Sequence, residues 1–141
     1  MGVNFVCRLQ PNGEGGFIAT FPDVPEALTE GATREEALEN AADALEVALL
    51  GRMKDGDDLP LPRKARTGAA VRVSAQASAK LAFYSAFQQS GLSRSALARK
   101  IGKDEAEVRR MLDPYHASKL SALDEALRAL GQRFVVAVEP A

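Results

Sequence analysis

Apolar residues recur at every second position near the start of the chain. This alternation runs from Val3 to Leu9 and again from Phe17 to Phe21, and it is typical of strands with one buried face. The loop between the two runs, residues 11–16, is rich in glycine, which tolerates the backbone angles of a tight connection. The sequence therefore predicts a β-hairpin at the start of the chain.

The periodicity changes from strand-like to helical after Gly31. A short extended piece at residues 27–29 leads to that glycine, and Thr33 and Glu36 then have the spacing of a capping box. Gly56 is expected to end the helix. The apolar stripe expected to pack on the sheet is Leu38, Ala41, Ala42, Leu45 and Leu49. The acidic residues expected to face solvent are Glu35, Glu39, Asp43 and Glu46.

Residues 59–76 have the composition of a linker followed by a strand. Prolines and the basic side chains of Arg63, Lys64 and Arg66 favour an extended connection. Apolar residues then alternate, which predicts a fourth strand at residues 71–75. This strand is expected to close the N-terminal sheet, either in its own subunit or in a partner's.

Residues 77–141 are predicted to be helical almost throughout. Four helices are expected, and Ser93 and Asp104 have the character of N-caps for the second and third of them. The expected helix ends are Gly91, Gly102, the Asp113–Pro114 pair and Gly131. Residues 133–138 are predicted to form a short strand that pairs subunits.

Charge is distributed unevenly along the chain, although the formal total is only −1. Up to Asp58, four Lys and Arg residues stand against twelve Asp and Glu residues, so this part carries −8. The remaining fourteen Lys and Arg and seven Asp and Glu residues give the rest of the chain +7. An acidic part suits a basic partner and a basic part suits a polyanion, so the chain is expected to join two binding functions.

Catalysis finds little support in the sequence. Cys7 is the single cysteine and His116 the single histidine, and neither has a predicted partner for nucleophilic or acid–base chemistry. We expect no enzyme activity, no cofactor and no metal. A single cysteine is typical of a reducing cytosol, and no apolar run approaches the ~20 residues that cross a bilayer. A cytoplasmic protein without membrane contact is therefore expected.

The stretch from Leu92 to Leu112 is the most informative segment of the chain. Its pattern predicts two short helices around a tight turn at Gly102, with the small Ala98 allowing them to approach closely. The stretch resembles the Cro and phage-repressor type of helix-turn-helix, which implies that the second helix enters the major groove of operator DNA. Two such motifs about 34–36 Å apart read a palindrome, so a homodimer or higher homo-oligomer is expected. The alternative is a four-helix domain used for protein contacts.

The resemblance assigns roles to individual side chains. On the second helix, Arg109 or Arg110 would bind a guanine edge and a glutamate would accept from cytosine. The other exposed positions of that helix are Glu105, Ala106 and Glu107. The side chains near helix N-termini that would meet phosphates are Ser93, Arg94 and Ser118. Lys103 is expected at the interface too, although the family usually has an apolar residue there.

The N-terminal part carries a second set of motifs. In order they are the aromatic Phe17, Phe21-Pro22-Asp23-Val24-Pro25, Thr29-Glu30-Gly31-Ala32-Thr33 and Glu35-Glu36-Ala37. Over residues 3–58 this order resembles the HicB antitoxin family. The resemblance implies a partial, non-catalytic ribonuclease-H-like sheet, a HicA-type toxin partner that cleaves mRNA, and repression of the pair's own operon.

The charge pattern and the resemblance agree on a basic toxin partner, because a toxin that cuts RNA must hold phosphates. The residues expected to bind the toxin lie in or beside the strand connections and are Glu14, Asp23, Glu26 and Glu30. The sequence thus predicts an α+β protein: a ribonuclease-H-like β-β-β-α-β lobe at 1–58, a linker and strand at 59–76, and an all-α helix-turn-helix domain at 77–141. Two alternatives stay open: a plain transcription regulator with a sensing or dimerising lobe, and a residual nuclease.

Overall fold

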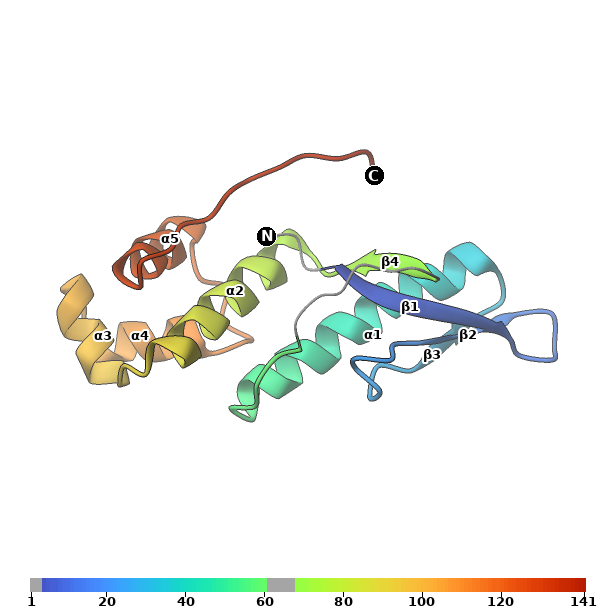
Figure 1. Cartoon of the computed structure of the whole chain (residues 1–141), viewed down its shortest axis with the longest axis horizontal. Coiled ribbons are helices and arrows are strands. Elements are labelled where there is room, and N and C mark those ends of the chain that lie inside the picture. Colours follow the sequence, from blue (N-terminus) through green and yellow to red (C-terminus); the bar gives the residue numbers. More distant parts are fainter. Residues whose placement is uncertain (1–3, 61–67) are drawn as a thin grey trace. The chain divides into compact units, whose positions relative to one another are not determined.

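A computed structural model describes residues 4–60 and 68–141 of the chain (Figure 1). It divides into two compact units, and the division falls after Ser78, inside a helix. We call them the N-terminal unit and the C-terminal unit. Val3 and residues 61–67, which belong to the predicted first strand and linker, lie outside the described residues. The elements are β1 (Asn4–Pro11), β2 (Phe17–Thr20), β3 (Thr29–Gly31), α1 (Arg34–Lys54), β4 (Ala69–Arg72), α2 (Ala75–Ser90), α3 (Arg94–Ile101), α4 (Glu105–Leu112) and α5 (Leu120–Ala129).

The N-terminal unit contains a four-stranded antiparallel sheet in the order β3-β2-β1-β4. The predicted hairpin of β1 and β2 is confirmed. Its turn is closed by the Asn12 side chain, whose Oδ1 accepts from the backbone N–H of Glu14 at 2.8 Å and of Gly16 at 3.0 Å. Gly13 and Gly15 have φ of 84° and 87°, angles that other residues rarely adopt.

The third strand lies two residues later than predicted, at Thr29–Gly31 instead of 27–29. The residues before it form two tight turns, with Val24 N–H donating to Phe21 O and Ala27 N–H donating to Val24 O. Val24 and Ala27 are buried. Because these turns use the local backbone groups and bury both apolar side chains, pairing with β2 begins only at Thr29.

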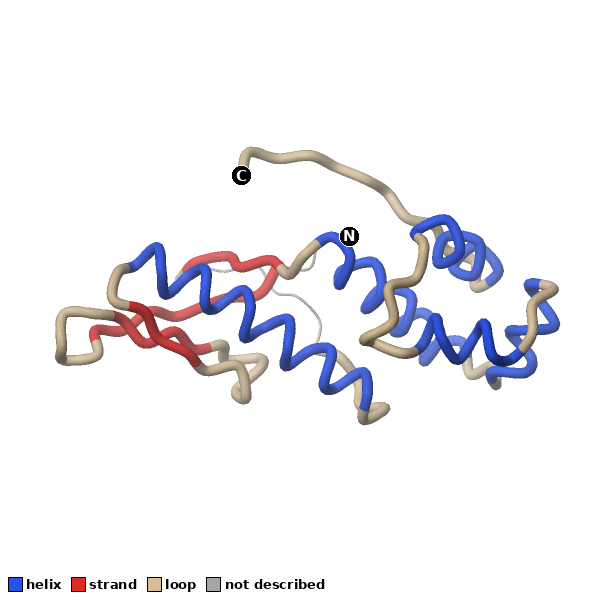
Figure 2. The backbone as a smooth tube through the Cα atoms, turned by 180° about the vertical axis from the view of Figure 1, so that it is seen from behind, coloured by secondary structure: helices blue, strands red, loops and turns tan. Residues whose placement is uncertain are grey.

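Helix α1 packs along one face of the sheet (Figure 2). Thr33 is its N-cap, as predicted, and accepts from the N–H of Glu36 at 3.1 Å. Gly56 follows its C-terminus with φ of 76°, also as predicted. The buried stripe differs from the predicted one, since Leu38 and Ala42 are half-buried. The residues that face the sheet are Ala37, Ala41, Leu45, Leu49 and Met53.

The fourth strand is confirmed within the same chain but lies earlier than predicted. β4 ends at Arg72 and pairs with β1, whereas Ala75 is already the first residue of α2. Capping contacts fix this transition, because the Ser74 hydroxyl accepts from Ala77 N–H at 3.2 Å and Glu46 accepts from Ser74 N–H at 2.9 Å. Glu46 was expected to face solvent, but its carboxylate accepts a hydrogen bond from the residue just before α2.

The C-terminal unit is helical around one apolar core. Ser93 and Asp104 cap α3 and α4 as predicted, accepting from Ala96 N–H at 3.1 Å and Glu107 N–H at 2.8 Å. The buried core residues come from α2, α3, α4 and α5 and are Phe83, Leu97, Ala98, Val108, Met111, Leu123 and Ala126.

The predicted strand at 133–138 is wrong for the single chain. After α5 the backbone is extended but lies in no helix or strand (Figure 1). Val135, Val136 and Val138 are 71%, 78% and 96% exposed. A strand requires a neighbouring strand to pair with, and no strand among the described residues pairs with this segment.

The mixed α+β class is confirmed, with four antiparallel strands and five helices in the described residues. No helix among those residues is both long enough and apolar enough to cross a membrane.

Candidate functional site

Helices α3 and α4 form the first candidate site, which we call the α3–α4 surface. Gly102 ends α3 in the left-handed conformation, with φ of 67°. The N–H of Lys103 donates to Ala98 O at 2.9 Å, so the chain reverses at once and Asp104 caps the next helix. Leu97 and Val108 are fully buried between the helices and the rest of the core. The structure therefore has the predicted pair of short helices joined by a tight turn.

Exposed cations gather on these two helices and the turn between them. Lys103 and Arg109 are exposed, as are Ser93 and Arg94 at the start of α3. The full set of exposed basic residues from 94 to 110 is Arg94, Arg99, Lys100, Lys103, Arg109 and Arg110. Such a set is suited to a phosphate-bearing partner.

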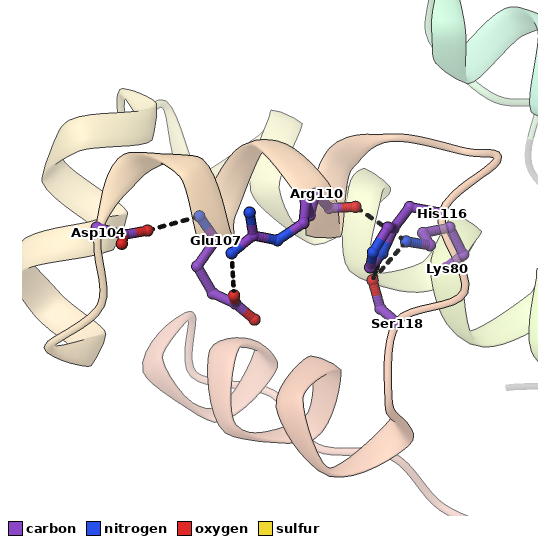
Figure 3. A network of polar contacts seen from close by, with 6 residues as sticks. All are labelled: Lys80, Asp104, Glu107, Arg110, His116 and Ser118. Atoms are coloured by element: carbon purple, nitrogen blue, oxygen red, sulfur yellow. Dashed lines mark hydrogen bonds and ion pairs between the residues drawn. The ribbon is translucent and has the colours of Figure 1, made fainter.

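Glu107 and Arg110 lie together on α4 (Figure 3). The Arg110 guanidinium donates to Glu107 Oε2 at 2.7 Å, and this hydrogen bond raises the pKa of Arg110. Glu107 is half-buried, like Ala106, whereas Glu105 is exposed. One of the two candidate base-reading arginines is therefore held by a neighbouring carboxylate, and Arg109 is exposed beside it.

A buried lysine lies behind the C-terminal end of α4 (Figure 3). Lys80 of α2 is 2% exposed, and its Nζ donates to Arg110 O at 3.3 Å, Met111 O at 3.1 Å and Ser118 Oγ at 2.8 Å. Burial lowers the pKa of this ammonium, and the charge of Asp113 partly offsets the effect. The ammonium thus satisfies carbonyls at the negative end of the α4 dipole.

Ser118 is buried, so its surroundings differ from those of an exposed phosphate-binding serine. Its hydroxyl accepts from Lys80 and lies 3.2 Å from His116 Nδ1. Sequence reasoning missed Lys80. The available signal was its place within the apolar run of α2, between Ala77 and Tyr84, where a charged side chain requires partners.

The second candidate site is a hollow in the N-terminal unit, which we call the acidic groove. It has a volume of about 580 Å³ and lies at the C-terminal end of α1. Its lining is Glu26, Ala48, Gly51, Arg52, Asp55, Asp57 and Asp58. Four carboxylates thus share this surface with one guanidinium.

Arg52 and Glu26 form a bidentate ion pair at one side of the acidic groove. The distances are 2.5 Å from Nε to Oε2 and 2.8 Å from the second guanidinium nitrogen to Oε1. The hydrogen bond from Arg52 lowers the pKa of Glu26. Glu26 is thus paired with Arg52, and the other carboxylates of the groove, those of Asp55, Asp57 and Asp58, are exposed. The hydrogen bond to Glu26 raises the pKa of the Arg52 guanidinium, and the charge of Asp57 also acts on Arg52 and raises this pKa.

The four acidic residues predicted to bind a partner are spread over the N-terminal unit. Glu26 lines the acidic groove, and Asp23 is half-buried in the turn before it. Glu30 is exposed on β3, and Glu14 is exposed in the β1–β2 turn. That turn lies at the opposite end of the N-terminal unit from the C-terminal end of α1 (Figures 1 and 2). Sequence reasoning missed Asp55, Asp57 and Asp58. They follow the end of α1, and only the fold brings them together with Glu26 in one groove.

Cys7 lies in β1 and is fully buried, and burial raises the pKa of its thiol. Among the residues that the structure describes, no group of three or more His, Cys, Asp or Glu side chains is arranged to hold a metal ion.

Comparison with known proteins gives consistent matches. Residues 4–82 match the family model described as HicB-like antitoxin of bacterial toxin–antitoxin system. The chain is 38% identical over 131 residues to Antitoxin HicB of Escherichia coli, covering 92% of this chain and 95% of that protein. It is 37% identical over 137 residues to Antitoxin HicB 1 of Photorhabdus laumondii, covering 97% and 88%. It is 33% identical over 142 residues to Antitoxin HicB of Pseudomonas fluorescens, covering 99% and 97%.

Proposed function

From the premise that this chain belongs to the HicB-like antitoxin family, we propose that it neutralises a HicA-type mRNA-cleaving toxin and represses its own operon by binding operator DNA. The observation that carries the proposal is the separation of charge between the parts of the chain. Up to Asp58 the formal charge is −8, and the remainder has +7. The role is regulatory and involves no catalysis by this chain.

The acidic N-terminal unit supplies the toxin-binding surface in this proposal. A toxin that cleaves RNA holds phosphates with basic side chains, and an acidic surface competes with RNA for them. The acidic groove supports this role because three of its carboxylates are exposed. Glu14, Asp23 and Glu30 remain proposed toxin contacts outside this groove. The β-β-β-α-β order of the unit supports its proposed likeness to part of a ribonuclease-H-like sheet.

The α3–α4 surface supplies the DNA-binding function in this proposal. We assign it as a helix-turn-helix with α4 as the recognition helix, supported by the tight turn at Gly102 and by the exposed Arg109. Ser93 and Arg94 at the start of α3 would contact phosphates. Lys103 lies in the turn between the helices, and Glu105 and Ala106 lie in the first turn of α4. All three would approach the major groove of the operator. A homodimer would present two such helices to a palindromic operator.

The first experiment tests DNA binding separately from toxin neutralisation. The double variant R109A/R110A removes two cations from α4, and we expect it to weaken operator binding by about tenfold or more while growth rescue from the co-expressed toxin is unchanged. Loss of both functions together would contradict the division of labour. Unchanged operator binding would contradict the assignment of α4.

The second experiment tests the acidic groove. The triple variant D55N/D57N/D58N removes three exposed carboxylates at the end of α1. The matched control E35Q/E39Q/D43N removes the same charge from exposed positions elsewhere on α1. We expect toxin affinity to fall about tenfold or more for the groove variant and by about twofold or less for the control. Equal losses would show a general charge effect and would contradict the groove as the contact.

A further inference from the structure

Helix α4 ends differently from the other helices that the structure describes. A glycine with positive φ lies one or two residues after the end of α1, α2, α3 and α5, and these glycines are Gly56, Gly91, Gly102 and Gly131. α4 instead runs into Asp113 and Pro114, and proline has no backbone N–H to donate. The carbonyls at the end of α4 therefore depend on partners from elsewhere in the fold.

Lys80 supplies those partners from α2. Its Nζ donates to Arg110 O at 3.3 Å, to Met111 O at 3.1 Å and to Ser118 Oγ at 2.8 Å (Figure 3). An ammonium has three N–H donors, so these three acceptors use all of them. The end of α4 is thus held by a side chain that lies thirty residues earlier in the chain.

The same ammonium holds both sides of the loop between α4 and α5. Met111 precedes this loop and Ser118 lies near its end. The Ser118 hydroxyl is buried and also lies 3.2 Å from His116 Nδ1. Lys119, the N-cap of α5, makes no side-chain capping bond. The position of this loop therefore depends on the contact between Lys80 and Ser118.

Direction, and not burial, is what a lysine contributes at this position. Burial lowers the pKa of Lys80, so it opposes the charged form, and an apolar side chain would avoid that cost. Apolar contacts are non-directional, whereas hydrogen bonds require a narrow range of distances and angles. Buried polar groups can in this way select one arrangement of packed elements among several similar ones.

We propose that Lys80 is a positioning residue for operator recognition, because it fixes the last turn of α4 within the C-terminal unit. That turn carries Arg109 and Arg110, and the carbonyl of Arg110 is itself one of the acceptors. Lys80 is 2% exposed, so it acts through α4 and not by touching DNA. The inference rests on the proposed DNA-binding function of the α3–α4 surface.

Base reading should depend on Lys80 more than phosphate binding does. A side chain that reads a base edge must be held within about 0.5 Å of its productive position. Ser93 and Arg94, the proposed phosphate contacts, lie at the start of α3, away from the end of α4 that Lys80 holds. Loss of Lys80 should therefore reduce the preference for operator over other DNA and leave affinity for other DNA nearly unchanged.

Lys80→Met in the full chain tests this prediction. Affinity is measured at one salt concentration for operator DNA and for an unrelated duplex of the same length. We expect the ratio of the two affinities to fall by about tenfold, with the affinity for the unrelated duplex within about twofold of the parent value. Phe87→Leu, on the same helix, is the control because it trims apolar packing on the same core and should keep the parent ratio.

Ser118→Ala removes one of the three acceptors and is the milder variant, which carries the test if Lys80→Met does not fold. We expect the affinity ratio to fall by about threefold. Equal losses for both duplexes would mean that Ser118 meets phosphate directly, and would overturn its place in this arrangement. A parent ratio for both Lys80→Met and Ser118→Ala would overturn the proposal.

Amide hydrogen exchange of the full chain without DNA tests the positioning itself. Lys80→Met should speed exchange at residues 109–113 by a larger factor than at residues 97–101 of α3, because the end of α4 opens locally. Phe87→Leu should speed both groups by similar factors, as a general loss of stability does. Similar factors for Lys80→Met as well would overturn the proposal.

Failure of the proposed function gives a different result from failure of this inference. A parent chain that did not prefer operator over the unrelated duplex would contradict the DNA-binding role, and with it the part of Lys80 in recognition. A parent chain that prefers operator, loses the preference in R109A/R110A and keeps it in Lys80→Met would overturn the role of Lys80 alone.

Discussion

At the level of single residues, helix caps were predictable and buried charge was not. Thr33, Ser93 and Asp104 each cap a helix as expected, because a cap depends on a side chain and an amide three residues away. Lys80 binds groups on Arg110, Met111 and Ser118, some thirty residues or more along the chain. A contact of that kind depends on tertiary packing, which sequence spacing does not reveal.

Lys80 is expected to be important for the stability of the C-terminal unit. Lys80→Met removes the donor for two carbonyls and a buried hydroxyl, and leaving such groups unsatisfied costs about 1–3 kcal/mol. We expect urea unfolding to show a loss of that size. Lys100→Met, at an exposed position of α3, makes the same change of composition and should alter stability by less than about 0.5 kcal/mol. Equal effects would show that the ammonium contacts contribute nothing specific.

The Glu26–Arg52 pair gives a prediction for the acid limb of stability. The pKa of Glu26 is lowered in the folded state, so its ionised form is stabilised by folding. This contribution is fully present above the unfolded pKa, near 4.5, and is lost as the pH falls through the lower folded pKa. Glu26 is 45% exposed, so the pair contributes about 1 kcal/mol or less.

We therefore expect Glu26→Gln to be slightly less stable than the parent chain at pH 7. At about pH 2 to 3 the two should be equally stable, because most carboxyl groups in folded proteins are protonated there and the parent loses the ion pair as well. Urea unfolding across this pH range measures the difference. Glu39→Gln, at an exposed position of α1, is the control. A stability difference for Glu26→Gln that did not shrink in acid would contradict the assignment of the ion pair.

At the level of elements, the periodic patterns predicted which segments are strands and helices better than where each begins. The β1–β2 hairpin and α1 follow from alternation, turn residues and a cap. β4 ends at Arg72 because Ser74 caps α2, although the apolar alternation continues to Ala75. At residues 133–138 the alternation is that of a strand, yet the described chain offers no adjacent edge. Residue preferences thus predicted where the backbone is extended, but a strand formed only where a neighbouring strand was available to pair with it.

Gly31, at the end of β3, allows α1 to approach the sheet closely. A Cβ at this position would lie 2.3 Å from Ala37 N and 2.7 Å from Ala37 Cα, both atoms of the helix backbone. Gly31→Ala should therefore push α1 and β3 apart, and overpacking of this kind costs about 1–3 kcal/mol or more. Thermal or urea unfolding of the full chain would measure the loss.

Gly51→Ala is the matched control for this change. Gly51 lies within α1, and a Cβ there has nothing within 4 Å. Alanine is a better helix former than glycine, so the control should gain about 0.5–1 kcal/mol. Opposite signs for the two substitutions are expected, and a neutral Gly31→Ala would contradict the close approach of helix and strand.

At the level of the whole molecule, the sequence predicted the family and the α+β class, and the fold added the surfaces. The motif order from Phe17 to Ala37 identified the family because those residues form a strand, turns and a helix start that lie next to each other in the chain. The acidic groove joins the loop at Glu26 to the helix end at Asp55 and the residues after it. Segments that distant come together only through packing of α1 on the sheet, so the groove was beyond reach of sequence reasoning.

The separation of charge predicts that variants of the two units change the salt dependence of operator binding differently. Operator affinity should fall steeply as salt rises, because each phosphate contact releases counterions and contributes about −0.9 to the logarithmic slope. R109A/R110A should make that slope shallower by up to about two if both arginines meet phosphates, and should relax base discrimination if one of them reads a base. D55N/D57N/D58N should leave the slope unchanged, because those residues lie in the N-terminal unit. Titrating labelled operator at several salt concentrations would measure the slope for the parent chain and for both variants. A larger change of slope for the groove variant than for the α4 variant would contradict the assignment of DNA binding to the α3–α4 surface.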